Sequence, residues 1–175
     1  MKRIKGDLIR LFGEGDFDIL VHGCNCAHAM GFGFAEGIRD SYPEAYAADK
    51  MTIRFDKSKM GTYSYADIWR DHRSGDDVER VFLGTIVNAY IQYHWKGTGK
   101  LCDYDAVRTV FRQLKRDYGN QGKAWGIPAI GSGSAGGDWH IVSAIIEEEM
   151  GDEDIIFVEF DGVTPFRCNF KRNMR

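Results

Sequence analysis

Two glycine-rich segments in this chain each lie between a short apolar run and an amphipathic helical pattern. Residues 25–35 follow the apolar run 19–21, and residues 131–138 follow the apolar run 124–130. Backbone N–H groups with no side chain in the way form a cradle for anions, and a helix that begins there adds partial positive charge. Two such loops at neighbouring strand ends could hold two phosphates, as in a diphosphate.

The remaining pattern indicates an α/β fold. Apolar runs at 81–87 and 155–160 predict two more buried strands. Apolar residues at helical spacing predict helices after Gly33, after Asp103 as N-cap, and over 139–150. Buried strands that alternate with helices indicate a three-layer fold with a sheet covered on both faces. In such sheets ligands bind beyond the carboxyl ends of the strands, where both glycine segments fall. Residues 50–77 are polar with scattered aromatics, and we expect strand and loop there.

Composition and charge narrow the class of protein. With 43% hydrophobic and 28% charged residues over 175 positions, the sequence is typical of one globular domain. We expect a cytoplasmic protein, because no apolar run approaches the roughly 20 residues of a membrane helix and no secretory signal is recognisable. A net charge of −3 argues against a nucleic-acid partner. Residues 166–175 carry four basic side chains, which we interpret as a solvated tail.

No motif for a metal or a cofactor is present in the sequence. The five histidines show neither H-x-x-x-H nor H-E-x-x-H spacing, so any catalysis is expected to be metal-independent and without a cofactor. Neither glycine segment has the Gly-Lys-Ser/Thr ending of a P-loop. The four cysteines are expected to be buried, reduced thiols: Cys24, Cys26, Cys102 and Cys168.

Four motifs in order give the chain a resemblance to a known family. Residues 18–25 followed by 31–35 resemble the macro domain pattern of a strand that ends in asparagine before a glycine-rich loop and helix. Residues 5–8 are similar to the family's N-terminal Gly-Asp-Ile/Leu, and 130–133 with 136–139 resemble its second phosphate loop. The greatest similarity is to the branch of ADP-ribose 1''-phosphate phosphatases. This resemblance implies a single macro domain over residues 1–175, with an α/β/α fold and a mixed central sheet.

The resemblance also implies where an ADP-ribose derivative would bind. Asp7, with Leu8 beside it, would accept a hydrogen bond from the adenine amino group, and Phe160 would pack against the adenine. From the residues alone, Asp7 could equally be a solvated turn residue and Phe160 plain core. Backbone groups of the two loops would surround the phosphates and the distal ribose: Gly31, Phe32, Gly33 and Phe34 in the first, and Ser132, Gly133, Ser134 and Ala135 in the second.

Four side chains are candidates for the chemistry. By the resemblance, Asn25 would bind the distal ribose hydroxyls beside the reacting carbon, although asparagine at a strand end is often only a turn former. His28 lies in the first loop, displaced by two positions from a histidine of a viral branch, and could instead be a loop histidine bonded to backbone. Asp138 and His140 could form an acid–base pair, or Asp138 could simply be a helix N-cap.

Three functions share this site. The first is a monomeric phosphatase that converts ADP-ribose 1''-phosphate to ADP-ribose and phosphate. The second is a module that binds ADP-ribose without turnover, and the third removes ADP-ribose from protein or nucleic acid. One protein-directed branch uses a lysine on the central strand and an aspartate in the second loop, whereas this chain has no lysine in 88–92 and has Ala135 in the loop. Gln92, Tyr93 and His94 are expected to border the distal pocket.

Overall fold

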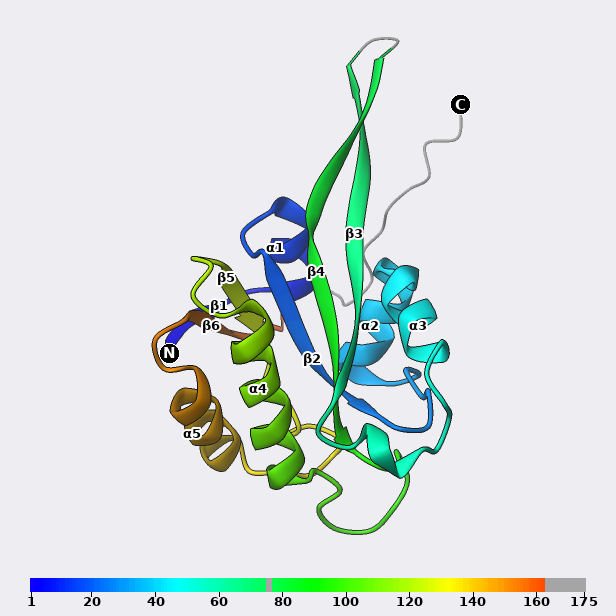
Figure 1. Ribbon diagram of the computed structural model, residues 1–175, viewed down its shortest axis with the longest axis vertical. Coiled ribbons are helices and arrows are strands. Elements are labelled where there is room, and N and C mark those ends of the chain that lie inside the picture. Colours follow the sequence, from blue (N-terminus) through cyan, green and yellow to red (C-terminus); the bar gives the residue numbers. More distant parts are fainter. Residues whose placement is uncertain (75–76, 163–175) are drawn as a thin grey trace.

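The computed structural model describes residues 1–74 and 77–162, and in this part a six-stranded sheet lies between two groups of helices (Figure 1). The strands are β1 (Lys2–Lys5), β2 (Ile19–Asn25), β3 (Tyr63–Ser74), β4 (Asp77–Gln92), β5 (Ala124–Ile127) and β6 (Asp154–Glu159). The helices are α1 (Leu8–Glu14), α2 (Gly33–Ser41), α3 (Pro43–Lys50), the short 3-10 helix η1 (Lys57–Lys59), α4 (Tyr104–Tyr118) and α5 (Trp139–Met150).

The sheet is mixed, in the order β1-β6-β5-β2-β4-β3. Its first five strands run parallel, and β3 pairs antiparallel with β4 at one edge. Parallel strands need crossover helices, and these helices cover both faces. The expected α/β/α architecture with a mixed central sheet is therefore confirmed.

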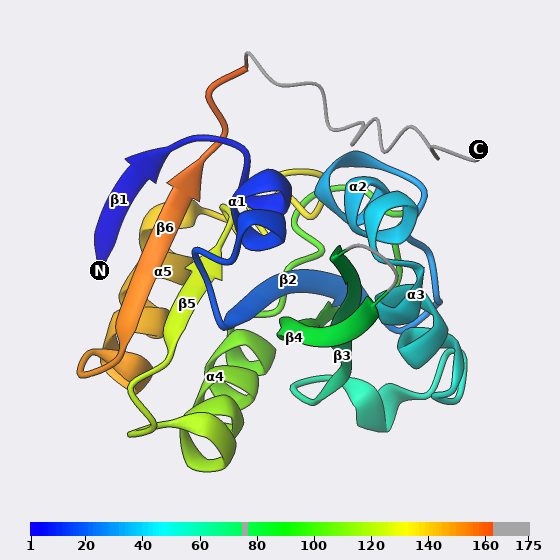
Figure 2. The ribbon, with the colours of Figure 1, turned by 90° about the horizontal axis from the view of Figure 1, so that it is seen from above.

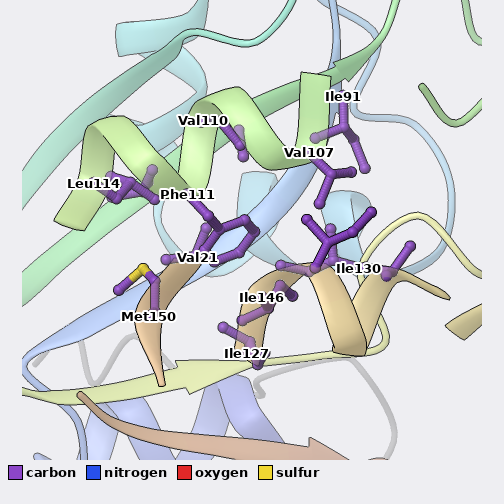
Figure 3. Close-up of a cluster of buried hydrophobic side chains, with 14 of the residues drawn as sticks. Val21, Ile91, Val107, Val110, Phe111, Leu114, Ile127, Ile130, Ile146 and Met150 are labelled. Carbon is purple, nitrogen blue, oxygen red and sulfur yellow. The ribbon is translucent and has the colours of Figure 1, made fainter. Parts of the chain in front are cut away.

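Alternate residues of the strands feed two separate cores. Helices α4 and α5 cover one face, and α1, α2 and α3 cover the other (Figure 2). Along β2, for example, Ile19 and Val21 pack under α4 and α5, whereas Leu20 faces α1 and α2. Figure 3 shows how Phe111 and Val107 of α4 meet Ile146 of α5 above the sheet. Because both faces are covered, the carboxyl ends of the parallel strands are left as the place for a ligand.

Several elements differ from the sequence-based expectation. Strand β1 was not expected, because all four of its residues are exposed and carry no alternation of apolar and polar side chains. Helix α1 was also missed, although Asp7 is its N-cap, and Pro43 does not merely end a helix but begins α3. The expected strand 81–87 is the centre of β4, which is 16 residues long.

The region of residues 50–77 contains the antiparallel edge strand. Strands β3 and β4 extend together well past the rest of the sheet as a two-stranded arm (Figure 1). A bulge between Ile68 and Trp69 marks the place where the arm leaves the sheet. Residues 166–175 and Cys168 lie outside the described residues, whereas Cys24, Cys26 and Cys102 are buried, as expected. No helix in residues 1–74 and 77–162 has the length and apolar character that spanning a bilayer requires.

Candidate functional site

A cleft opens at the carboxyl ends of β2, β4 and β5, between the two glycine-rich loops. It consists of a main cavity of about 880 Å³ and a smaller one of about 430 Å³. Four residues line both cavities, so the two form one continuous groove: Phe34, Pro128, Ala129 and Gly133. The main cavity alone has the size usual for a ligand site, about 300–1,000 Å³.

The first loop is held from inside by Asn25. The side-chain oxygen of Asn25 accepts hydrogen bonds from the backbone N–H groups of Ala27 (3.0 Å) and Ala29 (3.1 Å), and its Nδ2 donates to the carbonyl oxygen of Ala29 (2.8 Å). An amide has two acceptor lone pairs and two N–H donors. Since both lone pairs and one donor serve the loop, one N–H remains for a ligand in the cavity that Asn25 lines.

Contacts with residues 49–55 hold the same loop from outside. The N–H of Phe55 donates to the carbonyl oxygen of Cys26 (2.7 Å), and Nε of Arg54 donates to that of Ala27 (3.0 Å). His28 has a left-handed backbone, φ 59°, and its Nε2 lies 3.0 Å from the hydroxyl of Thr52. The ring of His28 is therefore directed at residues 49–55, and His28 is not part of the cavity lining.

The first loop leads into a helix end that no side chain caps. The N-cap residue of α2 is Phe32, which has no acceptor atom in its side chain. Within the described residues, the backbone N–H groups of Gly31 and Phe32 have no hydrogen-bond acceptor. Both residues line the main cavity. Donors without acceptors at the N-terminus of a helix favour an anion.

The second loop folds over Cys102. The N–H of Gly137 donates to the carbonyl oxygen of Gly131 (2.8 Å), and the N–H of Cys102 donates to that of Ala135 (3.0 Å). These bonds make the loop compact, and the N–H groups of Gly133 and Ser134 are left without a hydrogen-bond acceptor in the described part of the chain. Gly133 and Ser134 also line the main cavity, opposite the first loop.

Charge in the groove favours an anionic ligand. Among the described residues, the lining of the main cavity includes no Asp, Glu, His, Lys, Arg or Cys. The carboxylate of Glu159 lines the smaller cavity but is paired with Arg3 at 2.7 Å. Cys102 lies under the second loop, and its burial raises the pKa of its thiol to about 11, so it stays protonated at neutral pH. The polar groups offered to a ligand are thus mainly backbone N–H donors.

The smaller cavity has aromatic walls. Trp139 and Phe157 pack against one another with ring centroids 4.5 Å apart, and Phe160 lines the same space from the end of β6. Asp7 lies between two lining residues, Gly6 and Leu8. Its Oδ1 accepts from the backbone N–H groups of α1, at 2.9 Å from Ile9 and 3.3 Å from Arg10. Aromatic walls of this kind favour a flat ring as ligand. One carboxylate oxygen of Asp7 is used to cap helix α1.

The remaining candidates lie away from the groove. Asp138 caps α5, with Oδ1 accepting from the N–H of His140 at 2.8 Å, and neither residue lines a cavity of the groove. Burial lowers the pKa of His28, although Asp49 opposes that shift.

Of the four side chains considered for chemistry, that of Asn25 is in the lining of the main cavity. Of the three residues expected to border the distal pocket, Gln92 lines the main cavity, and Tyr93 and His94 do not.

A stack of aromatic rings borders the main cavity at Trp95, a residue that the sequence reasoning missed. His94 and Trp95 stack with centroids 4.2 Å apart and planes at 9°, and Phe55 stacks 5.5 Å from His94. We call these three residues the aromatic shelf. The guanidinium of Arg54 lies 4.8 Å from the Phe55 ring, and the ammonium of Lys96 lies 5.8 Å from that of Trp95. The shelf is therefore aromatic and positively charged.

One relative of this chain is a phage protein. The chain is 30% identical over 165 residues to the "Uncharacterized 17.5 kDa protein in tk-vs intergenic region" of Enterobacteria phage T4. The alignment covers 92% of this chain and 97% of the phage protein. No family model matches the chain.

Solved structures resemble this fold at low sequence identity. The macrodomain of Mycobacterium tuberculosis DarG has a TM-score of 0.67 and 22% identity, covering 91% of this chain and 95% of that one. The macrodomain of Thermus aquaticus DarG has a TM-score of 0.64 and 19% identity, with coverage of 91% and 95%. Thermosipho africanus DarTG in complex with ADP-ribose has a TM-score of 0.68 and 18% identity, over 93% of this chain but 42% of that one. At such identities the comparison establishes the fold.

Proposed function

Because this chain belongs to the family of the phage T4 17.5 kDa protein and has the macro domain fold, we propose that it binds ADP-ribose in the groove between its two glycine-rich loops. The observation that carries this proposal is the set of backbone donors without acceptors that face one cavity from both loops. The ADP-ribose complex of DarTG, a structural neighbour, supports the choice of ligand.

The diphosphate would lie between the loops. Gly31 and Phe32 present N–H groups from one side, and Gly133 and Ser134 present them from the other. Hydrogen bonds to an ionised acceptor contribute roughly twice as much as bonds between neutral groups. A cavity without a carboxylate in its described lining adds no repulsion against the two negative charges.

The adenine would occupy the aromatic smaller cavity, and Asp7 provides a test. We expect Oδ1 to keep its capping role while Oδ2 accepts from the adenine amino group. Asp7→Asn retains an N-cap of similar quality but replaces that second acceptor with an NH₂ group. By calorimetry, Asp7→Asn should weaken ADP-ribose binding by about tenfold while the melting temperature stays nearly unchanged. An unchanged affinity would remove Asp7 from the adenine site.

The proposal extends to hydrolysis of ADP-ribose 1''-phosphate. Water attacks phosphorus, the bond between phosphorus and the C1'' oxygen breaks, and ADP-ribose and phosphate leave. The loop N–H groups would stabilise the charge on the phosphoryl oxygens, and Asn25 would orient the distal ribose with its remaining N–H. Because the described cavity lining has no titratable side chain, the leaving oxygen takes its proton from the phosphate monoanion, and the proton of the attacking water ends on the released phosphate.

Two measurements on the wild type separate turnover from binding. Phosphate release from ADP-ribose 1''-phosphate, together with calorimetric binding of ADP-ribose, would support the phosphatase. Binding without phosphate release would leave a module that holds ADP-ribose. Asn25→Ala should lose both signals, because the turn over residues 26–29 loses its three side-chain bonds.

The aromatic shelf favours a second candidate, the removal of ADP-ribose from nucleic acid. The shelf begins at Trp95 in the lining of the main cavity, and Arg54 and Lys96 flank it. Aromatic rings beside cations bind unstacked bases and their phosphates. Release of ADP-ribose from a modified single-stranded DNA, with ADP-ribose 1''-phosphate left intact, would favour this candidate. Trp95→Ala should then slow release from DNA far more than it weakens binding of free ADP-ribose.

A further inference from the structure

Arg39, on helix α2, contacts the back of the first loop. Its Nη1 donates to the carbonyl oxygen of Met30 at 3.0 Å. A Cβ placed on Gly31 would lie 3.9 Å from the same nitrogen, so the guanidinium is packed against the Met30–Gly31 peptide. Gly31 lines the main cavity, whereas Arg39 lines neither cavity of the groove. The carbonyl of Met30 is therefore bonded on the side of the loop away from the ligand space.

This bond fixes where the N–H of Gly31 points. The described chain has no cis peptide bond, and in a trans peptide the carbonyl oxygen and the amide hydrogen lie on opposite sides. With the Met30 oxygen held at Arg39, the N–H of Gly31 is directed to the opposite side, toward the cavity. If the peptide turned over, an oxygen with partial negative charge would face the diphosphate in place of the donor.

Two carboxylates hold the guanidinium in place for this contact. Nε and Nη2 of Arg39 both bind Oδ1 of Asp40, at 2.8 and 2.7 Å, and Nη2 lies 3.6 Å from Glu36. Nη1 is left for the Met30 oxygen. The hydrogen bond with Asp40 raises the pKa of Arg39, so the group is charged at every pH at which the protein would be studied. Asp40 and Glu36 offset its charge, which leaves the direction of its N–H bonds as its main contribution.

We infer that Arg39 is a positioning residue for ligand binding: it holds the Met30–Gly31 peptide with the Gly31 N–H facing the diphosphate. This inference rests on the proposed function. Without Arg39 the peptide can adopt either orientation, and the orientation with the carbonyl inward must be reversed before the diphosphate binds. A tight ligand affinity therefore depends on a residue that does not touch the ligand.

Two variants test whether the donor to Met30 sets the ligand affinity. Arg39→Met removes the donor, whereas Arg39→Lys keeps a charged N–H donor on a long side chain that can approach the Met30 oxygen. We expect Arg39→Met to weaken ADP-ribose binding by about tenfold, the effect of one hydrogen bond to a charged group, and Arg39→Lys to recover most of it. Arg116→Met, which breaks an exposed ion pair with Asp117 on α4, is a control that should leave the ADP-ribose affinity unchanged.

The amide resonances of the two loops report orientation directly. In the wild type, saturating ADP-ribose should shift the Gly31 amide proton strongly downfield, together with Ser134 of the second loop. In Arg39→Met the Gly31 shift should shrink while the Ser134 shift persists at saturation. Equal losses of affinity in Arg39→Met and Arg39→Lys, or an unchanged Gly31 shift in Arg39→Met, would overturn the inference. A wild type that binds no ADP-ribose would instead refute the proposed function.

Discussion

Gly131 in the second loop is packed directly against Cys102, and replacing it with alanine should strain the loop in two separable ways. Its φ is +72°, where an L side chain costs about 1–2 kcal/mol. A Cβ there would also lie 2.6 Å from Sγ of Cys102, and overpacking of this kind costs about 1–3 kcal/mol. Gly131→Ala should therefore reduce the free energy of unfolding by about 2–5 kcal/mol.

A second substitution isolates the overlap. Cys102→Ala removes Sγ, and the nearest remaining atom of residue 102, its Cβ, lies at 3.5 Å from the new methyl group, an ordinary contact. The double variant should then be more stable than the sum of the two single effects by about 1–3 kcal/mol, the size of the overlap. Gly122→Ala is the matched control for backbone strain, since Gly122 has φ +66° and no atom within 4 Å of its Cβ position.

Urea unfolding of the wild type, both single variants, the double variant and Gly122→Ala measures these quantities at neutral pH. The same proteins should be titrated with ADP-ribose, because a second loop displaced by Gly131→Ala should bind the ligand more weakly and regain affinity in the double variant. If the two single effects add within about 0.5 kcal/mol, the loop does not rest on the Cys102 sulfur as described.

Three further outcomes are expected. Burial lowers the pKa of His22 to about 4 from 6.5, so the unfolded chain binds more protons than the folded one, and stability present above pH 6.5 is lost as the pH falls. Between pH 7.5 and 5.5 the free energy of unfolding should fall by about 1.3 kcal/mol, and urea unfolding of His22→Gln should show no such fall. Asn25→Asp keeps the acceptors for the loop but loses the donor to Ala29 and adds a negative charge in the groove, so calorimetry should show at least about a tenfold loss of ADP-ribose affinity, about 1.4 kcal/mol. Phe160→Ala should weaken binding of ADP-ribose about tenfold through lost stacking on the adenine, and a ligand without a base, ribose 5-phosphate, should bind both proteins equally.

The sequence predicted the elements in which the pattern of apolar side chains reflects which positions are buried. Strand β2 begins with an apolar run because both of its faces are buried. Helix α4 carries apolar residues on the one face that packs in a core, and Asp103 caps it as expected. Strand β1 has no such pattern, because it pairs with β6 through its backbone while its side chains stay exposed. Helix α1 is only seven residues long, too short for a helical period to stand out.

The candidate site was predictable where backbone groups form it, and less predictable where side chains form it. Glycine in both loops indicated backbone donors for a ligand, and glycines from each loop line the main cavity. The direction of the His28 ring depends on its left-handed φ and on its contact with Thr52, 24 positions along the chain. Neither feature can be predicted from the spacing of residues in the sequence. Trp95 joins the lining because it stacks on His94 beyond the end of β4, a contact without a sequence signal.

The structure of the protein with ADP-ribose bound tests the central claim most directly. The account predicts phosphate oxygens within about 3 Å of the backbone nitrogens of Gly31 or Phe32 on one side and of Ser134 on the other, with the adenine beside Phe160. A diphosphate bound outside the space between the two loops, with these nitrogens unchanged from the free protein, would contradict it.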